Sequence, residues 1–172
     1  PHLLDRWIRS SLSTLIRSVT EAMDQYDLQR AVRPFVQFVE DLTNWYIRRS
    51  RRRFWKSQDD ADKRHAYGTL YQVLVALSKV AAPFVPFLRE VLFRALRPAG
   101  QPESVHLCDF PVADEAARDP VLEAQMGWAL AVVKMGRQLR AEHDLKVRQP
   151  LARMHVACRR PEVREALTGL CD

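Results

Sequence analysis

Glycine and cysteine are both scarce in this sequence, and long apolar runs are missing from it. Five glycines among 172 residues are too few for the many tight turns of an all-β fold, and none forms a phosphate-binding loop. The three cysteines, Cys108, Cys158 and Cys171, stand far apart and never as C-x-x-C, which disfavours a disulfide framework or a zinc site. No apolar run reaches the roughly 20 residues that span a bilayer. We therefore expect a cytoplasmic, all-α protein without a metal or a membrane partner.

The composition is that of a soluble globular protein, but its excess charge lies in one place. Apolar residues make up 47% and charged residues 28% of the chain, which predicts a packed core. The formal net charge of +6 is accounted for by one segment, Arg48-Arg-Ser-Arg-Arg-Arg-Phe-Trp-Lys56, which holds six basic residues and no acidic one. A localised cluster of this kind indicates an anionic partner that contacts the chain there.

Apolar side chains recur every three or four residues through the first hundred positions and predict four helices. Residues 4–24 form the first helix, Asp27 caps a second that leads into the arginine run, and Ser57 to Asp60 supply caps for a third. The fourth follows Pro86. Short connections between four helices predict an antiparallel bundle over residues 1–100.

The remainder of the chain is expected to form a connector, one further helix and a small appendage. Residues 101–119 are the connector, with a strand-like run at Ser104–Leu107. Residues 120–150 contain a fifth helix that packs on the bundle. Residues 151–172 read as a strand followed by a short helix, a β-α module too small to be a domain, so we expect the chain to be a fragment of a longer protein.

No constellation of catalytic residues is found in the sequence. The five histidines have no histidine partner four residues away, and neither nucleophile motifs nor metal-ligand spacings occur. We therefore expect no catalytic residue, no metal ligand and no cofactor in this chain.

The arginine run is better suited to binding phosphate than to pairing along its own helix. None of its five arginines has an acidic residue three or four positions away, although acidic partners from elsewhere in the fold are not excluded by this. Arginine rather than lysine, interleaved with Trp45, Tyr46, Phe54 and Trp55, favours bidentate phosphate contacts beside stacking surfaces. Phe54 and Trp45 are expected in the core. Nucleic acid is the favoured partner, with a membrane surface or an acidic protein as alternatives.

Several motifs together resemble one family. They are Leu4-Asp-Arg-Trp-Ile8, Tyr26-Asp-Leu-Gln-Arg-Ala-Val-Arg-Pro34, Asp41-Leu-Thr-Asn-Trp-Tyr-Ile-Arg-Arg-Ser-Arg-Arg-Arg-Phe-Trp55, Ala82-Pro-Phe-Val-Pro-Phe87, Ser104-Val-His-Leu107 and Lys146-Val-Arg-Gln-Pro-Leu151. In this order they resemble the helical anticodon-binding domain of class I isoleucyl-tRNA synthetases. Valyl and leucyl enzymes, which share the architecture, and a free-standing RNA-binding helical module are the alternatives.

The resemblance implies a domain that binds the anticodon stem and loop of isoleucine tRNA, as a monomer and without catalysis of its own. The parent enzyme would use ATP and Mg²⁺ in a catalytic domain and correct errors in an editing domain, both covalently continuous with this chain. The ATP-site signatures H-I-G-H and K-M-S-K-S do not occur here. The residues expected to contact RNA are Arg48, Arg49, Arg51, Arg52, Arg53, Trp55, Lys56, Lys146 and Arg148.

Overall fold

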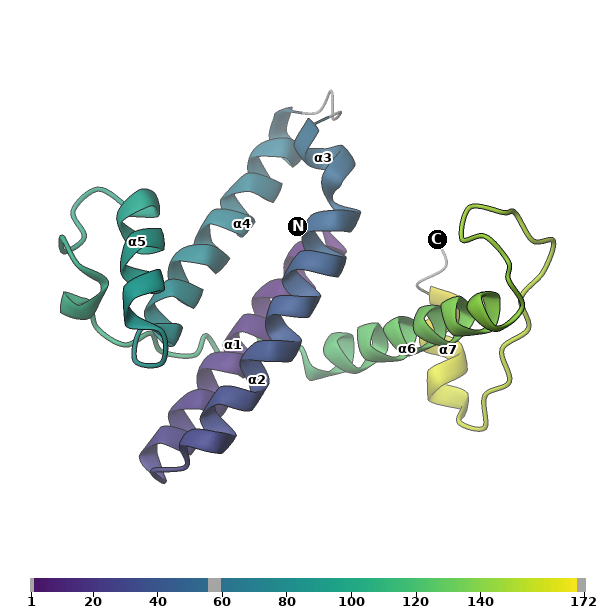
Figure 1. Cartoon of the computed structure of the whole chain (residues 1–172), viewed down its shortest axis with the longest axis horizontal. Helices are drawn as coiled ribbons and strands as arrows, with labels where there is room; N and C mark the ends of the chain where they lie inside the picture. Colours follow the sequence, from purple (N-terminus) through teal and green to yellow (C-terminus); the bar gives the residue numbers. More distant parts are fainter. Residues whose placement is uncertain (1, 56–59, 170–172) are drawn as a thin grey trace. The chain divides into compact units, whose positions relative to one another are not determined.

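A computed structural model describes residues 2–55 and 60–169 of the chain, and every regular element in those residues is helical. The predicted all-α class is therefore confirmed. The chain divides into two compact units, Pro1–Arg118 and Asp119–Asp172, which are described separately. Figure 1 shows the ribbon of both.

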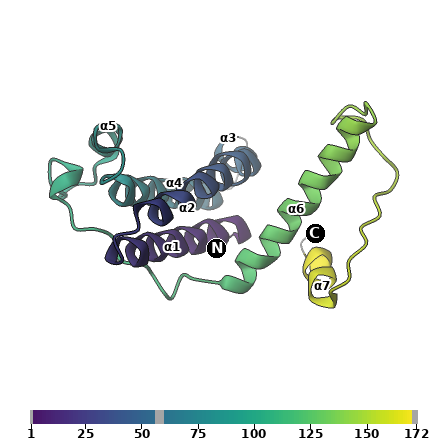
Figure 2. The ribbon, with the colours of Figure 1, turned by 60° about the horizontal axis from the view of Figure 1, so that its bottom comes forward.

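The first unit is built on long helices that pack side by side. Its α-helices are α1 (Leu3–Asp24), α2 (Leu28–Glu40), α3 (Arg51–Trp55), α4 (Asp60–Ala81) and α5 (Pro86–Leu96). Helix α1 packs against both α2 and α4, and α5 packs against α4 (Figures 1 and 2). The cap predicted for the second helix is confirmed, because the Asp27 carboxylate accepts a hydrogen bond of 2.9 Å from the Arg30 backbone amide.

The core of this unit follows the apolar stripe of α1. Ile8, Leu12, Leu15, Ile16 and Val19 recur at spacings of three and four, and all of them are buried. This spacing places the five side chains on one face of the helix, where neighbouring helices remove them from water. The sequence pattern thus predicted the buried face of α1.

The connection from α2 to α3 is a π-helix, whereas the sequence predicted that the second helix leads directly into the arginine run. The segment η1 (Asp41–Ile47) takes the wider i→i+5 hydrogen-bond pattern. It buries Leu42 and Tyr46. Backbone bonds from the Ser50 amide to the Tyr46 carbonyl (2.9 Å) and from the Phe54 amide to the Ser50 carbonyl (3.2 Å) lead on into α3.

The strand-like run after α5 is instead a single turn of 3₁₀ helix, η2 (Val105–Leu107). The prediction of a strand here is wrong because Glu90 of α5 binds the segment. Its carboxylate accepts hydrogen bonds of 2.9 Å from both the Ser104 hydroxyl and the Val105 amide. Val105 then packs with Ala82 and Phe93 in a small apolar cluster. Ser104 and Val105 of this motif therefore have structural roles in holding η2 against α5.

The second unit contains α6 (Pro120–Glu142) and α7 (Pro161–Gly169), which pack against each other. Asp119 caps α6 by accepting a hydrogen bond of 3.0 Å from the Leu122 amide. The predicted strand at 151–157 is wrong: these residues are irregular. Alternating side chains need a neighbouring strand to form a ladder, and no described segment supplies one. The helical half of the appendage is present as α7, and packing of 120–150 on the bundle stays a prediction.

Candidate nucleic-acid interface

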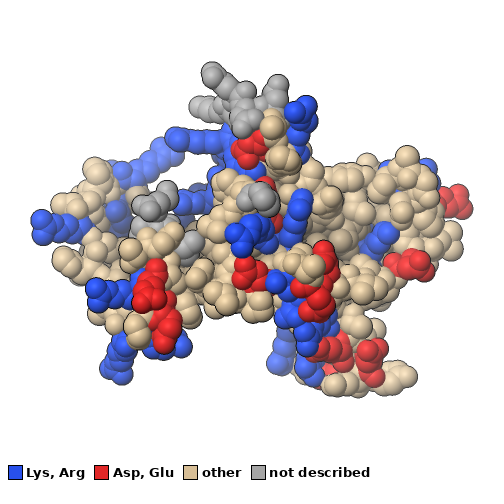
Figure 3. All heavy atoms as spheres, turned by 180° about the vertical axis from the view of Figure 1, so that it is seen from behind, with Lys and Arg blue, Asp and Glu red and all other residues tan. Residues whose placement is uncertain are grey.

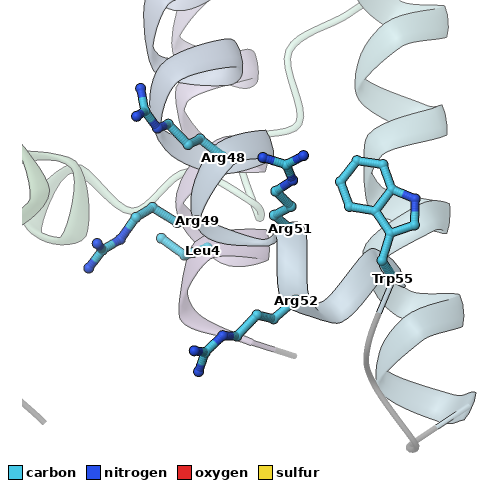
Figure 4. Close-up of a pocket in the computed structure, with 6 residues that line it drawn as sticks. All are labelled: Leu4, Arg48, Arg49, Arg51, Arg52 and Trp55. Atoms are coloured by element: carbon cyan, nitrogen blue, oxygen red, sulfur yellow. The ribbon is translucent and has the colours of Figure 1, made fainter.

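Four arginines near the junction of η1 and α3 form an exposed group, which we call the arginine cluster: Arg48, Arg49, Arg51 and Arg52. Together with Leu4 of α1 and Trp55 they line an open cavity of about 810 Å³. Figure 4 shows Arg48, Arg49 and Arg52 fanning outward, while Arg51 points toward the Trp55 ring. Four of the side chains predicted to bind RNA are thus brought around one hollow with an indole at its edge.

Within the described residues, no acidic side chain neutralises the charge of the arginine cluster. None of its four members makes an ion pair in the part of the chain that the structure describes. By contrast, Arg17, Arg94 and Arg118 each pair with a glutamate. Figure 3 shows basic side chains projecting in the upper part of the view, where some acidic atoms are also present, and blue and red atoms mixed lower down. Like charges held this close together without partners favour an anionic ligand.

Aromatic side chains accompany the cluster. Trp55 is 65% exposed, and the Arg51 guanidinium carbon lies 5.1 Å from the centre of its ring. Arg49 lies in the same way 5.9 Å from the ring of Trp45. These cation–π contacts hold the guanidinium groups beside flat apolar surfaces. Phe54 is buried, as the sequence predicted.

Arg53 does not belong to the exposed cluster, although the sequence grouped it with the residues expected to contact RNA. Its side chain is 11% exposed. Nη1 and Nη2 each donate to one oxygen of Asp5 at 2.8 Å, while Nε and Nη2 donate to Asp62 at 2.9 and 2.7 Å. Asp5 lies 48 positions and Asp62 nine positions away in sequence, so no search of neighbouring helical turns finds them.

Tyr46 completes this buried group, which we call the Asp5–Arg53 network: Asp5, Tyr46, Arg53 and Asp62. The Tyr46 hydroxyl donates to Asp5 Oδ1 at 2.8 Å and lies 3.2 Å from the Ala66 carbonyl oxygen. Burial raises the pKa of Asp5, but hydrogen bonds from Arg53 and Tyr46 outweigh it and hold the pKa below its usual value. Burial and the neighbouring Asp5 raise the pKa of Tyr46. The network joins α1, η1, α3 and α4.

The remaining predicted RNA contacts lie elsewhere. Lys56 is outside the described residues. Lys146 and Arg148 are exposed on the loop that follows α6, in the second unit. Arg140 Nη1 fixes this loop by donating to the carbonyl oxygens of Lys146 and Gln149, both at 2.9 Å. Their contact with RNA stays a prediction.

Comparison with known proteins identifies the family. The family described as "Anticodon-binding domain of tRNA ligase" matches residues 5–156, which include the arginine cluster. The chain belongs to this family. It is 56% identical over 153 residues to an isoleucine–tRNA ligase of Chlamydia trachomatis serovar D and 50% identical over 164 residues to that of Protochlamydia amoebophila. These alignments cover 89% and 95% of the chain, which spans about 15% of the length of these curated relatives.

Ser50 is a buried polar residue of this anticodon-binding domain. It is fully buried between Arg49 and Arg51, and its hydroxyl has no hydrogen-bond partner among the described residues. A buried unpaired hydroxyl costs about 1 kcal/mol or more. We therefore expect Ser50→Ala to raise the melting temperature by about 2–6 °C, measured by circular dichroism. A lower melting temperature would show that the hydroxyl is satisfied after all.

The carboxylates of the network make the stability of the domain sensitive to acid. Hydrogen bonds from Arg53 lower the pKa of both Asp5 and Asp62 in the folded state. A carboxylate whose pKa is lowered by folding stabilises the folded state fully when the pH is above its unfolded-state pKa of about 3.9. This stabilisation is lost as the pH falls below that value. The free energy of unfolding of the wild type, measured with urea, should therefore decrease below about pH 4. The stability difference between the wild type and Asp5→Asn should shrink over the same range, and a constant difference would contradict this assignment.

Among the described residues of this domain there is neither a metal-binding cluster nor a helix able to span a membrane. No three or more His, Cys, Asp and Glu side chains converge there in a way that could hold a metal ion. Within the same residues, none of the helices combines the length and the apolar character needed to cross a membrane.

Proposed function

We propose that this chain binds the anticodon stem and loop of isoleucine tRNA and belongs to an isoleucine–tRNA ligase of the cytoplasm. The observation that carries the proposal is the arginine cluster, which makes no ion pair with any residue that the structure describes and lies inside the range matched by the anticodon-binding family. The identity of 50–56% to isoleucine–tRNA ligases favours isoleucine over valine or leucine as the amino acid. A free-standing RNA-binding module is favoured by no observation.

The arginine cluster would contact the phosphates of the anticodon stem. A guanidinium group can donate two parallel hydrogen bonds to one phosphate, and four such groups around one cavity can follow a run of phosphates. Lys56, Lys146 and Arg148 would add phosphate contacts. These contacts give affinity and orientation but carry no sequence information.

Trp55 would stack on an unpaired base of the loop. Its indole is exposed at the edge of the cavity, and sequence-specific RNA recognition targets unstacked bases in single-stranded loops. Arg51 lies against the ring and would meet the phosphate of the same nucleotide.

The chemistry of the parent ligase would take place outside this chain. In the proposed parent, ATP and Mg²⁺ serve a catalytic domain that attaches isoleucine to tRNA, and an editing domain removes valine attached by mistake. This chain would contribute no catalytic residue and no cofactor. As a monomeric domain it would place the tRNA so that the acceptor end reaches the catalytic domain.

Titration with labelled RNA tests the proposal. The chain should bind isoleucine tRNA and its isolated anticodon stem-loop, with an affinity that falls as salt rises. A valine stem-loop should compete less well than the isoleucine stem-loop. Heparin and vesicles of anionic phospholipid serve as controls for charge alone. Binding to the vesicles or heparin as tight as to the isoleucine stem-loop would contradict the proposal.

A further inference from the structure

We propose that Arg53 is a positioning residue: anchored by Asp5 and Asp62, it sets the direction of the arginine cluster without touching RNA itself. This inference rests on the function proposed above. The side chain of Arg53 is 11% exposed and is bound to two carboxylates, whereas its neighbours Arg51 and Arg52 are exposed.

The network supplies an anchor that α3 lacks by itself. This helix is only five residues long, and its one buried side chain is Phe54, which packs against Tyr46 and Tyr67. An apolar ring contact resists separation but is not directional. The fork of Arg53 is directional, since it binds Asp5 on α1 and Asp62 on α4 at the same time. It therefore fixes the rotation of α3 about its own axis.

The anchored residues are direct sequence neighbours of the residues that line the cavity. Arg53 follows Arg52, and Asp5 follows Leu4, while both Arg52 and Leu4 face the cavity. Successive side chains on a helix are about 100° apart, so an inward Arg53 turns Arg52 and Arg51, which lie about 100° and about 200° away, out of the core. On α1, Asp5 points inward in the same way, and the preceding residue, Leu4, therefore lies beside these arginines at the cavity.

The charge of the network argues against a direct role in phosphate binding. The charge of the Arg53 guanidinium is shared between two carboxylates, Asp5 and Asp62, which offset it at close range. Asp62 keeps a side-chain exposure of 31% close to a proposed phosphate site. By itself, an acidic residue at this place repels phosphate. Holding Arg53 in position is the role that accounts for Asp62 here.

Two pairs of variants separate positioning from charge and from general stability. Arg53→Lys keeps the charge but cannot bridge both carboxylates with a planar fork, and Arg33→Lys is its matched control at an exposed position that does not line the cavity. Asp62→Asn removes a negative charge, and Asp24→Asn at the exposed end of α1 removes an equal charge away from the network. Isoleucine tRNA affinity and its salt slope are measured at a temperature at which far-ultraviolet circular dichroism shows each protein to be folded.

The two network variants should both bind tRNA about tenfold more weakly, with a salt slope lower by about one, because fewer phosphates are reached together. The control variants should bind within about threefold of the wild type. Asp62→Asn keeps Arg53 paired with Asp5 and therefore tests the proposal even if Arg53→Lys fails to fold. Unchanged binding by the network variants, or tighter binding by Asp62→Asn, would overturn the positioning role. A wild type that binds no tRNA would instead overturn the proposed function, and this inference with it.

Discussion

Replacing Arg49 and Arg52 together by Ala is expected to weaken the binding of isoleucine tRNA about a hundredfold. Both side chains are exposed, line the same cavity and have no acidic partner in the described part of the chain. A hydrogen bond to a charged group is worth about 1.5–3 kcal/mol, and two such losses correspond to two or more orders of magnitude in affinity. The salt slope should fall by about two, since each lost phosphate contact releases roughly one counterion fewer.

The matched control for this variant removes the same charge elsewhere. Arg33 and Arg97 are exposed and do not line the cavity. Their joint replacement by Ala should change the affinity by less than about threefold and leave the salt slope nearly unchanged, because screening weakens distant charges. Equal losses for the two double variants would show that only net charge matters. The melting temperature of the Arg49 and Arg52 variant should stay near that of the wild type or rise, as repulsion is relieved.

Asp5→Ala is expected to have the largest effect on stability. Asp5 is 1% exposed, and its removal leaves the Tyr46 hydroxyl and one side of the Arg53 fork without their shared acceptor. Removing one partner of a buried ion pair typically costs about 3–5 kcal/mol. Thermal unfolding should therefore begin at least about 10 °C lower than in the wild type.

Asp24→Ala is the control for the same chemical change on the same helix. Asp24 is exposed, and its replacement should shift the free energy of unfolding by no more than about 0.5 kcal/mol. Asp5→Asn should lie between the two, since its amide oxygen can still accept the Tyr46 hydroxyl. A melting temperature for Asp5→Ala equal to that of Asp24→Ala would contradict the importance of the buried network.

The helices could be predicted from sequence because their signals are local. The apolar stripe of α1 and the Asp27 cap depend only on residues within a few turns, and both predictions are confirmed. The strands predicted at Ser104–Leu107 and 151–157 do not form, because alternation favours a strand but the partner strand that a ladder needs is not encoded locally. Glu90, which binds the first of these segments, lies 14 positions before Ser104.

The candidate site was predictable in position but not in the orientation of each arginine. A run of basic residues without local acidic partners marks the place. At about 100° per residue, a helical projection places Arg53 on the same broad face as Arg48, Arg49 and Arg52, and it gives only the directions of these side chains relative to one another. Which side chain turns inward is decided by Asp5, which is 48 positions distant, and Asp5 stood out in the sequence only as part of the motif that begins at Leu4.

The π-helical segment Asp41–Ile47 makes the length of this part of the chain as important as its composition. Deleting one residue within it would let the backbone return to α-helical spacing, while α2 stayed packed on α1 through Ala31 and Phe38. Everything that follows would then turn by about 100° relative to α1. Arg53 would lose its carboxylates and the exposed arginines would leave the cavity, although no basic residue had been removed. A single-codon deletion here would therefore erase the site while preserving the full count of its charges.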